Sequence, residues 1–423
     1  MRNLKTMKPI CLSLLVLLGT LSGARGEDYR TDINPALLYY RAFLVQTEPM
    51  SEGDRNYLAS NKGKEQKLPE RFGKIVAGYD NQFSLVRQAA HATVPCDWGI
   101  DLSPGPNVLL PHLGRAKAVA QAAQLRAVWA LQHGRQADAC DELLAAFVLG
   151  RNVSTDGILI SALVQCMIED LDYGTVAQYF GEFSSETLKQ LVDGFDAAPP
   201  RQTMAACIPG EKALGDWLLR KILELQKAYP DDDAKVMAAF RDSGYVAGME
   251  SVGETNLWPR LVAASGGTSV GLVRLIREAE PLVASVAELM ALPPAEYETQ
   301  AKQFSAEILK SQNPFINALG FLIDKWQKRG FRPREFRVQA ELAMARAALQ
   351  YREQGESGLK NVRDPFGNGP FSFRRFVFRG VDRGFELRSA YAGADAPFVM
   401  IFVERPGPAF EVIGPDAGKP ISR

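Results

Sequence analysis

Residues 116–150 carry the strongest structural signal in the chain and read AKAVAQAAQLRAVWALQHGRQADACDELLAAFVLG. Residues 116–133 are rich in alanine and leucine, which have high helix propensity. Gly134 interrupts this run, and Ala139 and Leu143 then begin an apolar repeat with the 3.6-residue spacing of a helix. The stretch therefore predicts two helices that pack antiparallel around a turn at Gly134.

The same helical pattern continues on both sides of this hairpin. Asn34-Pro35 has the residue types of a helix start, with asparagine as the cap and proline at the first position. Residues 158–168 are almost wholly apolar, which predicts a helix buried in the middle of a helical layer. Further helices are expected at 185–195, 210–228, 232–242, 269–290, 295–311, 315–326 and 334–354. The fold is therefore predicted to be mainly α, an array of antiparallel helical hairpins with short connections.

The character of the chain changes after Gly355. Segments rich in Phe, Val, Ile and Tyr occupy 371–378, 384–391 and 397–404, and glycine-containing turns separate them. Residues 410–413 are a candidate for one more strand. We therefore expect a small antiparallel β module of the α+β type at the C-terminus.

The first 26 residues have the pattern of an export signal. Three basic residues precede an apolar run at 9–21, and residues 24–26 have the small-x-small form of a cleavage site. The apolar run is shorter than the roughly 20 residues that span a bilayer. We expect an exported protein, periplasmic or extracellular, without a transmembrane span in the mature chain. The chain divides into this signal at 1–26, a helical domain at 27–355 and a β-rich module at 356–423.

The charge balance excludes some classes of partner. The chain has 49 basic and 49 acidic residues, and its signal holds four basic residues and no acid, so removal of the signal leaves a net charge of −4. A mildly acidic chain has no general attraction for nucleic acid or for anionic membranes. We therefore expect no nucleic-acid partner, and a protein or another component of the cell envelope as the partner instead.

Four cysteines follow the signal, and an exported chain permits disulfides. Cys140 and Cys166 lie 13 residues on either side of Val153, near an expected turn between helices. An antiparallel hairpin with its turn there would place them at similar height, as a disulfide requires. The alternative is that both are free thiols buried as small apolar residues. No pair has the short spacing of a zinc site, and we predict neither a metal nor a cofactor.

The best candidate for a binding site is the proline-bounded loop at 95–111. The loop contains Asp97, Trp98 and Asp101, and His112 follows it directly. Two carboxylates and an imidazole are groups that perform acid–base catalysis or hold a metal, and a tryptophan in such a loop can stack on a sugar or a peptide. The alternative is that Trp98 fills a hydrophobic gap while the aspartates cap helices or turns.

Near the end of the chain, an alanine-rich helix leads into Asp364-Pro365-Phe366-Gly367 and then into the predicted strands. This arrangement, over residues 341–391, is similar to the C-terminal module of type II secretion pseudopilins. The resemblance implies a small α+β module. It does not imply pilus assembly or calcium binding, because the chain has a cleavable-looking signal in place of a prepilin start and lacks the acidic calcium-binding loop.

Residues 121–150 place small side chains at Ala127, Gly134, Ala139 and Ala146. This spacing resembles the helical hairpin of the tetratricopeptide repeat, although the aromatic signature of its first helix is missing and no second copy follows at the expected period of about 34 residues. The resemblance implies hairpin geometry. The layout as a whole resembles uncharacterised secreted bacterial proteins, which implies no activity.

Two functions from different classes remain open. The first is an exported binding or scaffold protein of the bacterial envelope, in which grooves between helices hold a protein or an envelope component. The second is an exported hydrolase that acts on envelope polymers through Asp97, Asp101 and His112. We favour the first, and a protein that is not an enzyme, because no complete catalytic motif accompanies these residues.

Overall fold

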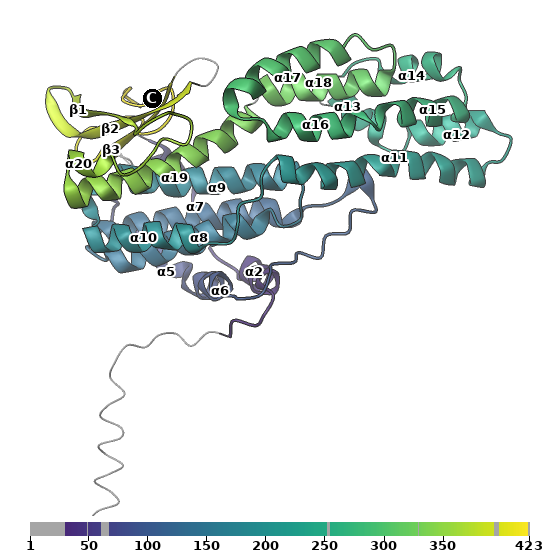
Figure 1. The fold of residues 1–423 in the computed structure, drawn as a ribbon. Coiled ribbons are helices and arrows are strands. Elements are labelled where there is room, and N and C mark those ends of the chain that lie inside the picture. Colours follow the sequence, from purple (N-terminus) through teal and green to yellow (C-terminus); the bar gives the residue numbers. More distant parts are fainter. Residues whose placement is uncertain are drawn as a thin grey trace, which may run out of the picture.

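A computed structural model describes residues 30–48, 50–60, 67–251, 254–328, 330–392 and 397–421. This part of the chain is mainly helical and carries a three-stranded antiparallel sheet near its C-terminus, which confirms the predicted fold class (Figure 1). The predicted signal at 1–26 lies outside the described residues. Within them, no helix combines the length and the apolar character that crossing a membrane requires.

A layer of long helices forms the middle of the molecule (Figure 1). Helices α7 (Pro111–Gln132) and α8 (Gln136–Val153) form the predicted hairpin, and α9 (Leu159–Gln178) packs against both. Gly134 makes the turn with φ of +70°, a backbone conformation that glycine adopts without steric cost. Buried alanines on the facing sides of α7 and α8 let the two helices approach closely. The antiparallel hairpin predicted at residues 116–150 is therefore present.

Cys140 and Cys166 do not form a disulfide; both are free and buried in the structure. The reason lies in the connection between their helices. Cys140 stands 13 residues before the end of α8, whereas Cys166 stands only seven residues after the start of α9, because α9 begins at Leu159 and not directly after Val153. At 1.5 Å per residue, the two positions differ by about 9 Å along the helix axes. A disulfide needs its Cα atoms within roughly 7 Å.

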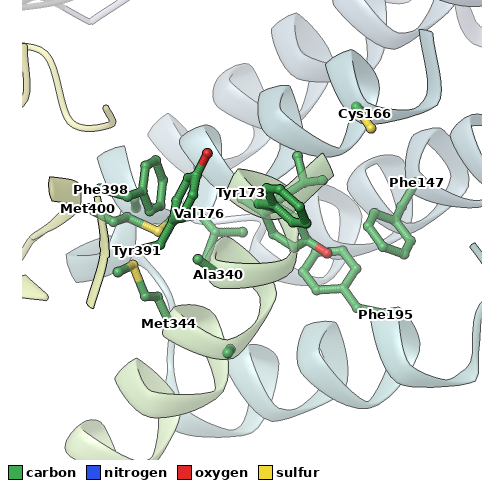
Figure 2. Close-up of a cluster of buried hydrophobic side chains, with 14 of the residues drawn as sticks. Phe147, Cys166, Tyr173, Val176, Phe195, Ala340, Met344, Tyr391, Phe398 and Met400 are labelled. Carbon is green, nitrogen blue, oxygen red and sulfur yellow. The ribbon is translucent and has the colours of Figure 1, made fainter. Parts of the chain in front are cut away.

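Helices α10 (Ser185–Ala197) and α19 (Phe331–Gln354) complete the layer around a common core (Figure 2). Near its centre, the ring centroids of Phe147 and Phe195 lie 4.5 Å apart, and the Tyr173 ring meets both edge-on at 5.8 and 5.3 Å. Side chains of the sheet enter the same cluster. One continuous core therefore joins the helical layer to the C-terminal strands.

The sheet has the order β1 (Ser372–Phe378), β2 (Val381–Ala392), β3 (Pro397–Val403), with both pairings antiparallel. Its inner face packs on α9 and α19, beside the short helix α20 (Glu356–Leu359). Residues of the C-terminal tail cover the outer face. In the predicted additional strand at 410–413, Phe410 and Ile413 form isolated bridges, to Pro420 and to Met400 of β3, so the segment touches the sheet but is not a regular strand.

On the side of the layer opposite the sheet lie shorter helices (Figure 1). They are α2 (Pro35–Leu44), α3 (Glu52–Ala59), α5 (Arg71–Gly78) and α6 (Asp80–Ala90). Helix α2 begins as predicted, because the Asn34 side chain accepts a hydrogen bond from the Ala36 N–H at 3.0 Å.

A second group of helices extends the molecule beyond the central layer, toward the end away from the sheet (Figure 1). It comprises α11 (Ile208–Ala228), α12 (Asp233–Arg241), α13 (Tyr245–Ser251), α14 (Leu257–Ser265), α15 (Ser269–Ala279), α16 (Leu282–Ala291), α17 (Pro294–Ile308) and α18 (Pro314–Lys328). Most of these helices share a core of their own. The single helix predicted at 269–290 is wrong: α15 and α16 are separate, because Pro281 cannot continue a helix from the residues before it.

Buried charges fix the segment that leads into α11. Arg201 pairs with Glu169 of α9, and Nε of Arg151 lies 2.7 Å from Oε1 of the same carboxylate. Glu335 of α19 accepts the Met204 N–H at 3.2 Å. Loss of one partner from a buried ion pair costs about 3–5 kcal/mol, since the other charge is left uncompensated. The start of α11 is therefore held firmly against the central layer.

Candidate ligand-binding site

The predicted site around Trp98 is a packing arrangement. The Trp98 side chain is only 5% exposed, its ring stacks on His112 at 4.5 Å between centroids, and its Nε1 donates to the Asn152 carbonyl at 2.7 Å. Tyr39 and Phe43 of α2 stack on the same ring at 5.7 and 6.2 Å. Because these neighbours enclose the indole, it has no open face on which a sugar or peptide could stack.

Asp97 and Asp101 hold turns in this loop. Oδ1 of Asp97 accepts the Gly99 N–H at 2.8 Å, and Asp101 accepts the N–H and the hydroxyl of Ser103 at 2.8 and 2.7 Å. The Ser103 hydroxyl holds the pKa of Asp101 below its usual value. Both carboxylates are exposed, whereas His112 is fully buried. The structure therefore does not present Asp97, Asp101 and His112 to one ligand, and these residues act as turn caps and core.

A large polar groove of about 1140 Å³ lies between α5, α6, α7, α8 and α10. Its central charges are paired within the protein. Arg126 donates to Glu142, to Asp80 and to the Val76 carbonyl at 2.7–3.0 Å, and Arg87 donates to Glu142 at 2.9 Å. Because these groups already have partners, a ligand would have to compete with them, and we place the candidate site elsewhere.

A second cavity has the features of a small-molecule site. It has a volume of about 500 Å³ and is lined by residues of α11, α13, α15, α16 and α18. Figure 1 shows where these helices lie. We call it the α11 groove. Its walls are mostly apolar and include Leu218, Leu219, Met249, Ile276, Leu319 and Trp326. Ligand sites in proteins are usually concave, apolar and about 300–1,000 Å³ in volume, with a few polar groups that orient the ligand.

Two exposed glycines line the α11 groove. Gly215 of α11 and Gly248 of α13 both line it, and a Cβ atom at either position would meet no atom within 4 Å. Glycine in a helix interior costs about 1 kcal/mol relative to alanine, so helix stability alone favours alanine at both positions. Gly210 shows the contrast, since a Cβ there would lie 2.2 Å from the Gly157 carbonyl oxygen. No close contact therefore requires glycine at position 215 or 248, and both positions have room for a larger side chain.

Charged groups stand at the margin of the α11 groove. Oε1 of Glu211 accepts the Leu159 N–H at 2.9 Å, and burial raises the pKa of this carboxyl. Lys212 donates to both carboxylate oxygens of Asp216, one turn further along α11, at 2.8 Å each. Glu280, which follows α15, is exposed and also lines the groove. The site thus combines apolar walls with an excess of carboxylates.

The proline-bounded loop reaches the α11 groove through a residue that the sequence did not indicate. Asn107 belongs to a short 3₁₀ helix, η1 (Gly105–Asn107), and lines the groove while its Nδ2 donates to the Ser243 carbonyl at 3.3 Å. Gly105, with φ of +63°, lies against α11, where a Cβ would come within 2.2 Å of the Trp217 ring. The loop at 95–111 therefore contributes Asn107 to the groove, and not its aspartates or Trp98.

Comparison of the chain with protein-family models, curated proteins and solved structures gave no match. The pseudopilin and tetratricopeptide resemblances therefore stay predictions, and the function has to be argued from the groove. Within the described ranges, no group of three or more His, Cys, Asp or Glu side chains is placed to hold a metal ion.

Proposed function

We propose that this chain is an exported binding protein that holds an apolar small molecule, a component of the envelope or its surroundings, in the α11 groove. The observation that carries the proposal is the mostly apolar cavity of about 500 Å³ between five helices, with Gly215 and Gly248 among its lining residues. Export rests on the signal pattern of residues 1–26.

The lining of the α11 groove favours binding, because its walls are mostly apolar. Within the described chain, the lining contains no Ser, Thr, Cys or His, and its acid–base groups are Glu211, Lys212, Asp216, Tyr245 and Glu280. Burial of apolar surface supplies the affinity. A ligand that removes roughly 300 Å² of its apolar surface from water gains about 7 kcal/mol. A gain of about 7 kcal/mol corresponds to a dissociation constant of about 10 μM, and the costs of association weaken it toward the millimolar range.

Titration with the neutral apolar fluorophore Nile red tests this function. The native protein is expected to bind the dye saturably at one site. Gly215→Leu and Gly248→Leu each place a side chain in the open space of the groove and should weaken binding roughly tenfold or more, since a displaced ligand loses its apolar contacts. Circular dichroism should show unchanged helix content in both variants.

Gly114→Leu is the matched control. Gly114 is also a helical glycine whose Cβ would meet nothing within 4 Å, but it lies in α7 and does not line the groove. This variant should bind Nile red as the native protein does. Absence of saturable binding to the native protein, or equal binding by Gly248→Leu, would contradict the proposal.

A further inference from the structure

We infer that the ligand of the α11 groove is an amphiphile with a protonated amine head and an apolar tail, and that Glu211 receives the head. The inference rests on the proposed binding function and adds the chemical class of the ligand to it.

The charges that line the α11 groove favour a cationic ligand. Glu211, Asp216 and Glu280 supply three carboxylates, and Lys212 is the one cation among the lining residues that the structure describes. Lys212 is bound to both oxygens of Asp216, so these two charges compensate each other. Glu211 and Glu280 have no ion pair within the described residues. The groove therefore repels an anionic head and attracts a cationic one.

Of the two unpaired carboxylates, Glu211 is the better placed to bind the ammonium head. It is partly buried at the apolar wall, whereas Glu280 is exposed. Its Oε1 accepts the Leu159 N–H, and its second oxygen accepts no hydrogen bond from a described residue but keeps contact with solvent. An ammonium head at this oxygen supplies a donor and the opposite charge.

Glu211 also has a structural role, which the test must separate from binding. It lies in the first turn of α11, where the helix dipole favours a carboxylate, and its bond to Leu159 ties α11 to the start of α9. Glutamine retains a carbonyl oxygen at the same place and can keep the Leu159 hydrogen bond. Glu211→Gln therefore removes the charge while it preserves the contact between the two helices.

The volume of the α11 groove suits a small amphiphile. It is about 500 Å³, within the roughly 300–1,000 Å³ of typical small-molecule sites. An alkyl chain is narrow enough to lie along its apolar walls.

Competition against Nile red tests the ligand class with three probes that share a twelve-carbon tail. Dodecylammonium, dodecanol and dodecanoate are compared at neutral pH and below their micelle concentrations. Dodecylammonium is expected to displace the dye at a concentration roughly tenfold or more below that of dodecanoate, with dodecanol between them. In Glu211→Gln, this preference should fall to within about threefold, while Nile red binding persists and shows that the groove is intact.

Glu186→Gln provides the matched control, because Glu186 occupies the first turn of α10 and lies outside the groove. It removes the same charge and should leave the preference unchanged, which excludes a general attraction of an acidic protein for cations. Absence of saturable Nile red binding to the native protein would contradict the binding function itself. Equal potency of the three probes, a preference for dodecanoate, or a full preference retained in Glu211→Gln would overturn the inference and leave the binding function standing.

Discussion

Replacement of Trp98 by alanine is expected to remove a large part of the stability of the protein. The indole is nearly fully buried, and it is stacked on His112 and on two aromatic rings of α2. Truncation of a buried aromatic side chain to alanine costs about 3–5 kcal/mol. The Asn152 carbonyl also loses the donor that lies 2.7 Å away, which adds about 1 kcal/mol. The total of about 4–6 kcal/mol compares with a typical free energy of unfolding of about 5–15 kcal/mol.

Urea denaturation followed by far-ultraviolet circular dichroism measures this loss. Trp98→Phe keeps part of the stacking area but loses the hydrogen bond and the volume of one ring, so it should cost about 1–3 kcal/mol. Asp101→Ala removes an exposed turn cap and should cost less than about 1 kcal/mol. If Trp98→Ala were as mild as Asp101→Ala, the indole would not be a core residue, and a ligand-binding role for the loop would have to be reconsidered.

Two further substitutions test the fold. Asp172 is fully buried and has no hydrogen-bond partner among the described residues, and its burial holds its pKa well above the usual value. The native state therefore keeps a proton that the unfolded chain loses above about pH 4, so this group lowers stability as the pH rises. The free energy of unfolding of Asp172→Asn, relative to that of the native protein, should rise by up to about 1.4 kcal/mol per pH unit until the folded-state pKa of Asp172 is reached. A stability difference that stays constant from about pH 4 to 8 would refute this expectation. Gly384 has φ of +145°, and a Cβ there would lie 2.0 Å from the Phe402 carbonyl oxygen. Gly384→Ala should therefore destabilise the pairing of β2 with β3 by more than about 2 kcal/mol, and an unchanged melting temperature would contradict the observed register.

Local signals predicted much of the fold. The alanine- and leucine-rich run before Gly134 and the apolar repeat after it depend on neighbours a few residues away, and both became helices. The predicted disulfide between Cys140 and Cys166 was wrong, because the distance between residues on two helices depends on where both helices begin and end. The five residues that connect α8 to α9 shifted Cys166 toward the turn by more than one helical turn relative to Cys140.

The candidate site was harder to predict, because long-range packing determines which side chains are exposed. Nothing close to Trp98 in sequence shows that α2 covers it, and the bonds between Asn34 and the backbone of Asp97 join residues 63 positions apart. The α11 groove is built from helices spread over residues 208–328, so no short motif marks it. Gly215 and Gly248, two glycines inside helices, were the local signal that could have indicated an open surface.

A crystal structure of the protein with dodecylammonium tests the central claim most directly. The account predicts the alkyl chain in the α11 groove, next to Gly215 and Gly248, and the ammonium nitrogen within about 3 Å of the Glu211 carboxylate. An empty groove at a saturating concentration, or a bound chain whose head lies away from Glu211, would contradict it.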